Sequence, residues 1–404
     1  MNSRRVLVTA ALLVCAWAGL QTRLAVLGAQ GAAPRFGDPI PGLLPAEFER
    51  FRIGLDDFLE VETAEEGLGP SFNAGSCAVC HNVPAIGGVS LVSEIRAAHR
   101  DANGVIRPLT GADGQPLDTL FHLFSNPTHG CQPALPPEAN VIARRVPIPL
   151  FGAGLVEAIP DETLLALEDR DDRNGDGISG RAARITDAGT GQPRVGRFGW
   201  KAQHATLRTF SADAYRNEMG ITNEIFRDEL ANGVSAAQMK LCDPTPDPED
   251  LPDPRTRLAA IDNFEAFMKF LGPPPRGAAS DAVRAGEQIF SSAGCASCHT
   301  PTLTTGPSAH PAFSRVAVPL FSDLLLHDVG TGDGIPQGAA RPEEIRTPSL
   351  WGLRARRPLL HDGSASTIDD AIRRHGGEAD GVRRRVEQLD AGQRAALLAF
   401  LESL

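Results

Sequence analysis

Two copies of one five-residue pattern constrain this chain more than any other feature. One copy is Cys-Ala-Val-Cys-His and the other is Cys-Ala-Ser-Cys-His. In a Cys-x-x-Cys-His pattern each cysteine adds to a haem vinyl group, and the adjoining histidine becomes an axial ligand of the iron. The sequence therefore predicts two covalently bound haem c groups. The attachment residues are Cys77, Cys80 and His81 for haem 1, and Cys295, Cys298 and His299 for haem 2.

Other uses of a Cys-x-x-Cys pair fit the sequence less well. A dithiol redox site does not need a histidine at the fifth position, and four of the seven cysteines fall in the two motifs. A zinc site needs two further ligands for each motif, and neither motif has a second Cys or His pair close by. Thioether-linked cysteines cannot alternate between thiol and disulfide, so thiol oxidoreductase chemistry is disfavoured.

Composition is that of a globular protein with sizeable cores. Charged residues make up 22% and hydrophobic residues 42% of the 404 positions, which excludes a disordered chain. The net charge of −11 argues against nucleic acid as a partner, because phosphates repel an acidic surface. The 41 glycines and 32 prolines predict long loops around short helices.

Residues 1–29 have the order of a secretory signal peptide. Arg4 and Arg5 precede an apolar run from Val6 to Leu20, and small residues follow up to Ala29. The run is shorter than the roughly 20 residues of a membrane span, so we expect no stable membrane insertion. An uncleaved anchor is the alternative. Cleavage near Ala29 would give a periplasmic protein, in the compartment where bacterial haem attachment takes place.

Two cysteines remain outside the motifs and the signal peptide, namely Cys131 and Cys242. An even pair of cysteines in an oxidising compartment predicts a disulfide. Two isolated thiols are the alternative that the sequence leaves open.

The chain divides at a proline-rich boundary. Apolar residues spaced by three and four predict an amphipathic helix over Leu258–Leu271, which Gly272–Pro275 ends because proline cannot continue a helix. A second predicted helix covers Asp281–Phe290, and Asp390 is the expected N-cap of a terminal helix. This last helix should pack on the first helix of its domain.

The predicted fold is mostly α, because the sequence contains no long alternating segments. We expect an N-terminal cytochrome c-like domain at 36–272, with a long loop-rich insertion at roughly 83–250. A C-terminal cytochrome c-like domain is expected at 278–404.

Several segments carry a family resemblance. Arg346–Trp351, Leu360–Gly363 and Thr367–Ile372 together resemble the "TP-x-L-R-N … HDG … TL-x-x-A" segment of bacterial di-haem cytochrome c peroxidases. The whole chain is more similar to the di-haem oxidoreductase branch of that superfamily. The further matching segments are 67–70 with Phe72 and Asn73, then 196–201, 321–324 and 375–378.

The resemblance implies a second axial ligand for haem 2. In the peroxidases the residue fourteen positions after the histidine of the HDG motif is the distal methionine of the C-terminal haem, and counting from His361 gives His375. A bis-histidine iron, with His299 and His375, is saturated and serves as an electron store or relay. His375 as a helix surface residue is the alternative, and His327 is the second candidate ligand. His361 should orient its surroundings through hydrogen bonds.

Haem 1 has no equally convincing distal ligand, so the open or switchable iron is assigned there. His99 is a candidate ligand for a resting form, although its charged neighbours favour a solvated side chain. Glu157 aligns with the distal glutamate segment of the peroxidases. A lone Glu in an apolar run predicts a buried acid–base carboxyl with a raised pKa. An ion pair with Arg144 or Arg145 is the competing interpretation.

An aromatic side chain between two haems would assist electron transfer, and a tryptophan near that place is a feature of the superfamily. The chain has only three tryptophans and one tyrosine, which leaves Trp200 and Trp351 as candidates, with Trp200 preferred. A tryptophan packed in a core explains either residue equally well.

A possible calcium loop is independent of the haem motifs. Asp172, Asn174 and Asp176 alternate before a glycine, as in the first half of an EF-hand loop. The twelfth position is Ala183 and not a bidentate acid. A polar turn without a metal is the alternative.

These observations predict a periplasmic di-haem c-type oxidoreductase of the peroxidase-like kind. It would reduce a small oxidant such as hydrogen peroxide at haem 1, with electrons relayed through haem 2 from a soluble donor such as a small cytochrome or cupredoxin. Two alternatives remain open. One is a di-haem oxygenase or protein-modifying oxidase, and the other is a non-catalytic di-haem electron-transfer protein.

Overall fold

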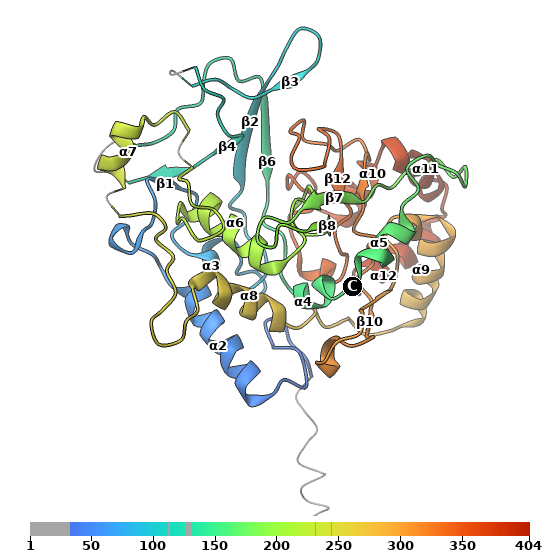
Figure 1. Cartoon of the computed structure of the whole chain (residues 1–404). Coiled ribbons are helices and arrows are strands. Elements are labelled where there is room, and N and C mark those ends of the chain that lie inside the picture. The colour runs from blue at the N-terminus through green and yellow to red at the C-terminus, as the bar shows by residue number, and fades with distance from the viewer. Residues whose placement is uncertain (1–32, 112–113, 127–130, 231, 244) are drawn as a thin grey trace, which may run out of the picture. The chain divides into compact units, whose positions relative to one another are not determined.

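The computed structural model describes residues 33–111, 114–126, 131–230, 232–243 and 245–404. The predicted signal peptide, residues 1–29, lies outside the described residues. Phe36–Leu404 form one compact unit, which is described here by itself (Figure 1). Within the described ranges, no helix is both long enough and apolar enough to cross a membrane.

Helices account for more of the described chain than strands do. The α-helices are α2 (Pro45–Leu59), α3 (Cys77–Cys80), α4 (Ala153–Glu157), α5 (Asp161–Leu167), α6 (Leu207–Met219), α7 (Ala236–Cys242), α8 (Ala260–Phe270), α9 (Asp281–Ser292), α10 (Ile368–Arg373), α11 (Asp380–Glu387) and α12 (Ala391–Leu401). Short 3-10 helices occupy Ala64–Glu66, Cys295–Ser297, Pro311–Phe313, Leu353–Ala355 and Gly377–Ala379.

The strands are short and antiparallel. They are β1 (Ser71–Phe72), β2 (Glu94–Arg100), β3 (Ile106–Arg107), β4 (Leu120–Phe121), β5 (Phe124–Ser125), β6 (Val141–Arg145), β7 (Ala183–Thr186), β8 (Pro193–Gly196), β9 (Leu303–Thr304), β10 (Ala317–Val318), β11 (Leu326–His327) and β12 (Ile345–Arg346).

The same helix crossing occurs twice. Helix α2 packs on α8, and α9 packs on α12. A Cβ atom added to Gly54 would overlap the carbonyl oxygen of Asn263, and one added to Gly286 would overlap that of Ala396. Only glycine permits so close an approach of two backbones. Helix α2 of the first crossing precedes the first Cys-x-x-Cys-His motif in the sequence. Helix α9 of the second crossing leads directly into the second motif.

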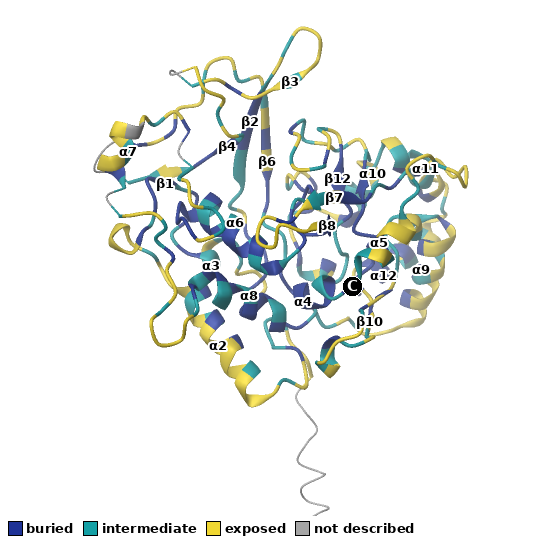
Figure 2. Ribbon diagram, in the orientation of Figure 1, coloured by how far each residue is buried: buried dark blue, intermediate teal, exposed yellow. Residues whose placement is uncertain are grey.

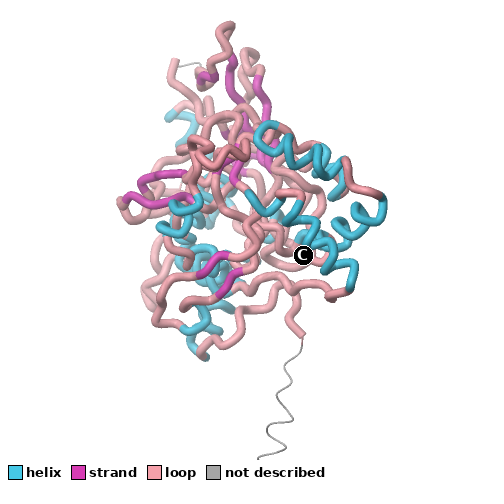
Figure 3. Tube along the Cα trace, turned by 90° about the vertical axis from the view of Figure 1, so that its right-hand side faces the viewer, coloured by secondary structure: helices cyan, strands magenta, loops and turns pink. Residues whose placement is uncertain are grey.

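The three helices predicted from sequence are confirmed as α8, α9 and α12. Asp390 is the N-cap of α12, where its side chain accepts a hydrogen bond from the backbone N–H of Gln393. The predicted packing of the terminal helix on the first helix of its half is the α9–α12 crossing. Figure 3 shows the helices around the C-terminus gathered on one face, joined by loops.

Two large hydrophobic cores hold the unit together. The first gathers buried side chains of α2, α4, α6 and α8, together with several residues between Leu303 and Leu325. The second gathers those of α9, α10, α11 and α12. Figure 2 shows the buried positions of α4 and α8 in the interior and the exposed positions of α2 on the outside. Residues after 278 thus contribute to both cores, and the predicted domain boundary stays a prediction.

The insertion contains a sheet that the sequence analysis did not predict. Strand β2 pairs with β6 on one side and with β3 and β4 on the other, as the upper part of Figure 1 shows. Strand β2 lacks the usual alternation of apolar and polar residues because Arg96, only 5% exposed, is buried in it. The Arg96 guanidinium pairs with the Glu94 carboxylate, and the distance from Nε to Oε1 is 2.9 Å. This ion pair allows a charged residue to occupy a buried position of the strand.

The insertion is also closed by a disulfide. Cys131 and Cys242 are bonded, with their Cα atoms 6.2 Å apart. The pairing predicted from sequence is therefore confirmed, and it links the chain before β6 to the end of α7.

Candidate functional site

Two cavities lie in the unit, one at each Cys-x-x-Cys-His motif. Their empty volumes, counted with their open mouths, are about 1160 Å³ for the first cavity, which contains Cys77, Cys80 and His81, and about 1240 Å³ for the second. The second contains Cys295, Cys298 and His299. Apolar side chains provide most of the surface of both cavities, and each cavity contains two cysteines and a histidine, so the donor set in each fits a covalently held haem.

Local structure sets the spacing of the cysteines. In the first motif the Ser76 side chain caps α3 by accepting a hydrogen bond from the Ala78 N–H at 3.3 Å. In the second motif Gly294, with φ +93°, introduces the 3-10 helix Cys295–Ser297. One helical turn separates the two cysteines of each motif, so both face the same side of the chain. The histidine follows at the end of the turn.

Three of the histidines that line the two cavities share one hydrogen-bonding arrangement. Nδ1 of His81 lies 2.9 Å from the Gly88 carbonyl oxygen. Nδ1 of His299 lies 3.1 Å from the Phe321 carbonyl oxygen. Nδ1 of His375 lies 2.7 Å from the Ala371 carbonyl oxygen. An Nδ1–H donating to a carbonyl leaves Nε2 free to bind a metal. The first cavity contains one such ring, whereas the second contains two.

Burial also keeps these rings in the form that binds iron. It lowers the pKa of His81 and of His299 to about 4, and it lowers the pKa of His375 as well. A neutral imidazole is the metal-binding form. The structure therefore brings His299 and His375 to the same cavity, as the sequence count suggested, and their coordination of one iron remains a prediction.

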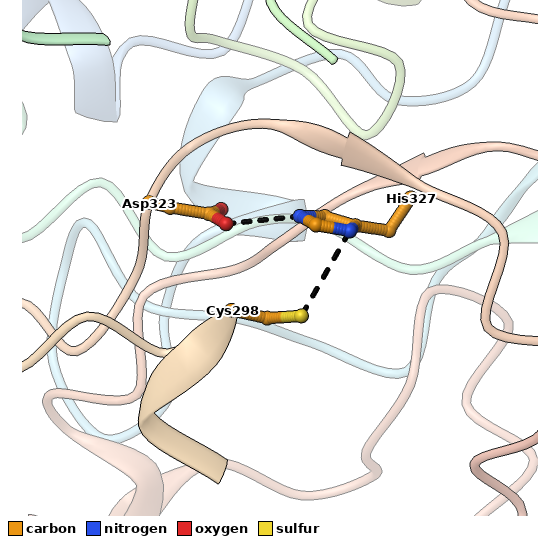
Figure 4. A group of neighbouring side chains, drawn as sticks. All are labelled: Cys298, Asp323 and His327. Atoms are coloured by element: carbon orange, nitrogen blue, oxygen red, sulfur yellow. Dashed lines mark hydrogen bonds and ion pairs between the residues drawn. The ribbon is translucent and has the colours of Figure 1, made fainter. Parts of the chain in front are cut away.

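His327, the second candidate ligand, is engaged at both ring nitrogens. Its Nε2 lies 2.9 Å from Asp323 Oδ2 and its Nδ1 lies 2.8 Å from Glu378 Oε2. Figure 4 shows the ring between Asp323 and Cys298, whose sulfur lies 3.8 Å from Nδ1. Burial alone would lower the pKa of His327, but the two carboxylates raise it well above its usual value. Because both ring nitrogens are engaged, His327 has no free nitrogen for iron.

The cysteines of the motifs are not activated thiols. Burial raises the pKa of Cys77 and of Cys80 to about 12, and it raises the pKa of Cys295 to about 11. Redox-active dithiols have a lowered pKa. The surroundings therefore fit thioether attachment better than thiol exchange.

Charged side chains distinguish the first cavity. Its lining includes Glu94, Arg96, Arg145, Asp213 and Glu218. Asn73 Nδ2 donates to Glu218 Oε2 at 2.7 Å. The carboxyl groups of Glu94 and Glu218 are also hydrogen-bonded to each other.

These two carboxyl groups have opposite pKa shifts. Burial and the negative charge of Glu94 raise the pKa of Glu218 to about 8. Burial would raise the pKa of Glu94 too, but the positive charges of Arg96 and Arg145 lower it. At neutral pH the pair therefore holds one proton, on Glu218, and one negative charge, on Glu94. A neighbouring acid and base of this kind can move protons for a bound substrate.

Glu157, the acid–base residue expected from the resemblance, lies at the end of α4 and outside the lining of both cavities. Its Oε1 accepts a hydrogen bond from the Leu207 N–H at 2.7 Å, at the start of α6. The competing ion pair is not formed with Arg145, whose Nε instead lies 2.7 Å from Asp333 Oδ2. The structure thus gives Glu157 a capping contact, and Glu94 and Glu218 are the acidic pair at the cavity.

Other candidates for the sixth ligand of haem 1 separate into two groups. The His99 ring lies 2.7 Å from the Glu138 carbonyl oxygen and outside the lining of the first cavity. Met219 and Met268 both line it. Sequence could not reveal Glu94 and Glu218, because β2 and α6 are brought together only by the fold of the insertion.

Trp200 lines both cavities. It is 5% exposed, and its Nε1 donates to the Val146 carbonyl oxygen at 2.8 Å. Trp351, the other candidate, lines neither cavity. Trp200 therefore contacts both cavities, and its position between two haems and its role in electron transfer stay predictions.

The possible calcium loop is a turn with its own hydrogen bonds. Asn174 Oδ1 accepts from the Asp176 N–H at 2.9 Å, and Asp172 Oδ1 accepts from the Gly177 N–H at 3.1 Å. Asn174 and Asp176 are exposed. Calcium at Asp172, Asn174 and Asp176 remains a prediction.

Comparison with known proteins identifies relatives of this chain. A family model described as "Di-haem oxidoreductase, putative peroxidase" matches residues 131–404. The methylamine utilization protein MauG of Methylorubrum extorquens is 28% identical over 139 residues, which cover 31% of this chain and 35% of that protein. Hydrazine synthase subunit gamma of Kuenenia stuttgartiensis is 27% identical over 184 residues, covering 37% and 49% respectively. The matched regions thus span less than half of these curated relatives.

Two solved structures align with most of the chain at low identity. A MauG-like protein associated with microbial copper homeostasis aligns over 93% of both chains, with 16% identity and a TM-score of 0.42. The diheme peroxidase BthA from Burkholderia thailandensis aligns over 92% of this chain and 90% of its own, with 15% identity and a TM-score of 0.39.

Proposed function

Because the chain belongs to the di-haem oxidoreductase family, whose members are oxidoreductase enzymes, we propose that it reduces a small peroxide at the first cavity. Hydrogen peroxide is the substrate that we favour. The observation that carries this proposal is the pair Glu94 and Glu218 in a cavity that has one metal-binding histidine ring.

The proposed residues of the first cavity have distinct tasks. The haem, when bound, supplies the iron that exchanges electrons with the substrate. Reduction of one peroxide to two waters consumes two electrons and two protons. Glu94, as the carboxylate, would accept a proton from one peroxide oxygen, and Glu218, as the neutral acid, would supply a proton to the oxygen that leaves as water. Arg96 and Arg145 stabilise the negative charge that develops as the oxygen–oxygen bond breaks.

The second cavity is proposed to deliver the electrons. His299 and His375 would occupy both axial positions of haem 2, which then exchanges electrons without binding a substrate. The electrons would come from a soluble donor such as a small cytochrome or cupredoxin. Trp200, whose side chain contacts both cavities, is proposed to carry them toward the first.

Covalent attachment and a periplasmic location belong to the same proposal. Both motifs present two cysteines and a histidine to a largely apolar cavity. The Cys131–Cys242 disulfide suits an oxidising compartment. The order of residues 1–29 suits export. Mass spectrometry of the secreted holoprotein should find two haems that remain bound after denaturation.

Electron paramagnetic resonance of the ferric holoprotein tests the proposed division of work. We expect one high-spin signal, from haem 1, and one low-spin signal, from haem 2. Addition of hydrogen peroxide should remove the high-spin signal, and electrons from a reduced donor should restore it. Two low-spin signals in both the oxidised and the half-reduced protein would contradict peroxide binding.

A specific observation favours one alternative, the non-catalytic electron carrier. Met219 and Met268 line the first cavity, and a methionine sulfur can complete a low-spin haem. In that case the near-infrared charge-transfer band of a His/Met haem would appear, and peroxide would leave the spectrum unchanged. Replacement of each methionine by Leu would identify the ligand.

A further inference from the structure

Two buried arginines in the second cavity lack the partners that buried arginines have elsewhere in the fold. Arg96 pairs with Glu94, Arg145 with Asp333, and Arg197 with Asp161. Arg346 is 4% exposed and Arg356 is 8% exposed. Across the described residues, neither of these two forms an ion pair with a carboxylate.

The contacts of Arg346 leave part of its guanidinium available. Nε donates to the Gly199 carbonyl oxygen at 2.8 Å, and Nη1 donates to the Thr347 carbonyl oxygen at 3.0 Å. The backbone N–H of Arg346 donates to the Trp200 carbonyl oxygen at 2.8 Å. These contacts fix the side chain beside Gly199 and Trp200 without neutralising its charge.

Arg356 approaches the same tryptophan from another element. It ends the 3-10 helix Leu353–Ala355, and its Cζ lies 5.9 Å from the centroid of the Trp200 ring. Burial lowers the pKa of Arg356 to about 10. Burial, with the positive charge of Arg356, lowers the pKa of Arg346 to about 10. Both groups still carry a positive charge at neutral pH, and both line the second cavity.

A buried charge without a partner is costly, and the cost is relieved only by an opposite charge. A haem carries two propionate carboxylates on the edge opposite its vinyl groups. Once the vinyl groups are bonded to cysteines, these carboxylates enter the cavity with the porphyrin. Guanidinium is the side chain that best matches a carboxylate in shape and charge.

We infer that Arg346 and Arg356 bind the propionate carboxylates of haem 2 and thereby turn that edge of the porphyrin toward Trp200. This inference rests on the proposed attachment of haem 2 to Cys295 and Cys298. It deepens the proposed relay, because Trp200 also lines the first cavity. The thioether bonds orient the porphyrin, and the two arginines hold its propionate edge beside Trp200.

The test uses the holoprotein and its variants Arg346→Gln, Arg356→Gln and Arg356→Lys. Resonance Raman spectra report the propionate bending band of each haem, and spectroelectrochemistry reports each midpoint potential. We expect the band of haem 2 to shift in both Gln variants and to shift less in Arg356→Lys, which keeps the charge. The potential of haem 2 should fall in the Gln variants, because an unpaired propionate favours ferric iron.

Arg357→Gln is the matched control. Arg357 adjoins Arg356 but is exposed and does not line the second cavity, so the haem 2 band should stay at its wild-type position. A haem 2 band that is unchanged in both Gln variants would overturn the inference. If a Gln variant fails to accumulate, Arg356→Lys and the native protein remain as tests.

A free anion is the other source of negative charge that could occupy the two arginines. Titration of the native holoprotein with inorganic phosphate distinguishes the sources. Phosphate should leave the haem 2 band and potential unchanged if the propionates hold both arginines, and a saturable change would overturn the inference. Fewer than two haems per chain would refute the proposed function itself, whereas two haems with unchanged bands would refute only the propionate contacts.

Discussion

The two cavities start from the same pentapeptide and are completed by different parts of the chain. The first takes Glu94 from β2 and Glu218 from α6, both in the insertion. The second takes His375, which follows α10, and two arginines for which the described residues supply no ion pair. Under the proposed function the motif would attach the haem, and distant residues would determine what that haem can do. A cavity with a proton donor suits chemistry, whereas a cavity with two imidazoles suits electron storage.

Replacement of His375 is expected to remove most of the difference in iron coordination between the two cavities. His375→Gly leaves haem 2 with His299 alone, so its low-spin signal should convert entirely to high-spin. Electron paramagnetic resonance of the ferric variant measures the change. The same experiment on His99→Ala, outside the lining of both cavities, serves as control. If haem 2 stays low-spin in His375→Gly, another residue is its ligand.

Replacement of Glu218 should affect only the first cavity. Glu218→Gln keeps the shape of the side chain but cannot donate the acidic proton, so kcat/KM for peroxide should fall about 10²- to 10⁴-fold. Stopped-flow kinetics measures the loss, and the haem 2 spectrum should not change. Glu157→Gln is the matched control, because its carboxyl lies outside both cavities. An equal loss of kcat/KM in both variants would contradict the proposed role of Glu218 as the proton donor.

The pH dependence of kcat/KM for peroxide should reflect the titration of the Glu218 carboxyl. Burial and Glu94 raise the pKa of Glu218 to about 8, so the acid form predominates below that pH and is lost above it. We expect kcat/KM to fall as the pH rises through about 8, and this limb should disappear from the remaining activity of Glu218→Gln. A limb that persists in the variant belongs to another group.

The free energy of unfolding should depend on the same titration of Glu218, whose contribution should decrease as the pH rises. The folded state keeps a proton on Glu218 that the unfolded state releases near the ordinary carboxyl pKa of 4.5. The contribution of this group to the free energy of unfolding therefore falls as the pH rises from about 4.5 to about 8. Denaturant titrations of the wild type and of Glu218→Gln across this range would measure it.

Replacement of Trp200 should produce the smallest effect. Trp200→Phe removes the hydrogen bond to Val146 and some packing, which should cost about 1–2 kcal/mol of stability. Electron transfer between the haems should slow, by less than the effect of Glu218→Gln on peroxide. Pulse radiolysis of the half-reduced protein measures that rate. Trp351→Phe is the control, and equal slowing in both variants would remove Trp200 as the connecting group.

The parts of this protein that sequence predicts are those that depend on neighbouring residues. The motifs, the helices α8, α9 and α12 and the Asp390 cap each have a local pattern with a physical cause. His375 was found by counting within a family segment, and the structure places it in the second cavity.

The missed residues depend on contacts across the chain. Glu94 and Glu218 are far apart in sequence, and neither lies in a pattern that marks an acid. Strand β2 was not recognised because Arg96 occupies a buried position. The sequence suggests His327 as an iron ligand, but it does not show that Asp323 and Glu378 engage both of its ring nitrogens. Buried charges are satisfied by partners that the fold brings close, and the sequence alone does not show which partners these are.

The first hydrophobic core has a consequence for how the protein is made. Several of its side chains lie between Leu303 and Leu325, which is downstream of both haem motifs. A ribosome delivers the N-terminal motif long before these residues exist. If a haem is attached to Cys77 and Cys80 as proposed, attachment can therefore precede closure of the first core. A chain truncated before residue 303 should therefore be unable to complete the first hydrophobic core, even if a haem is attached at its first motif.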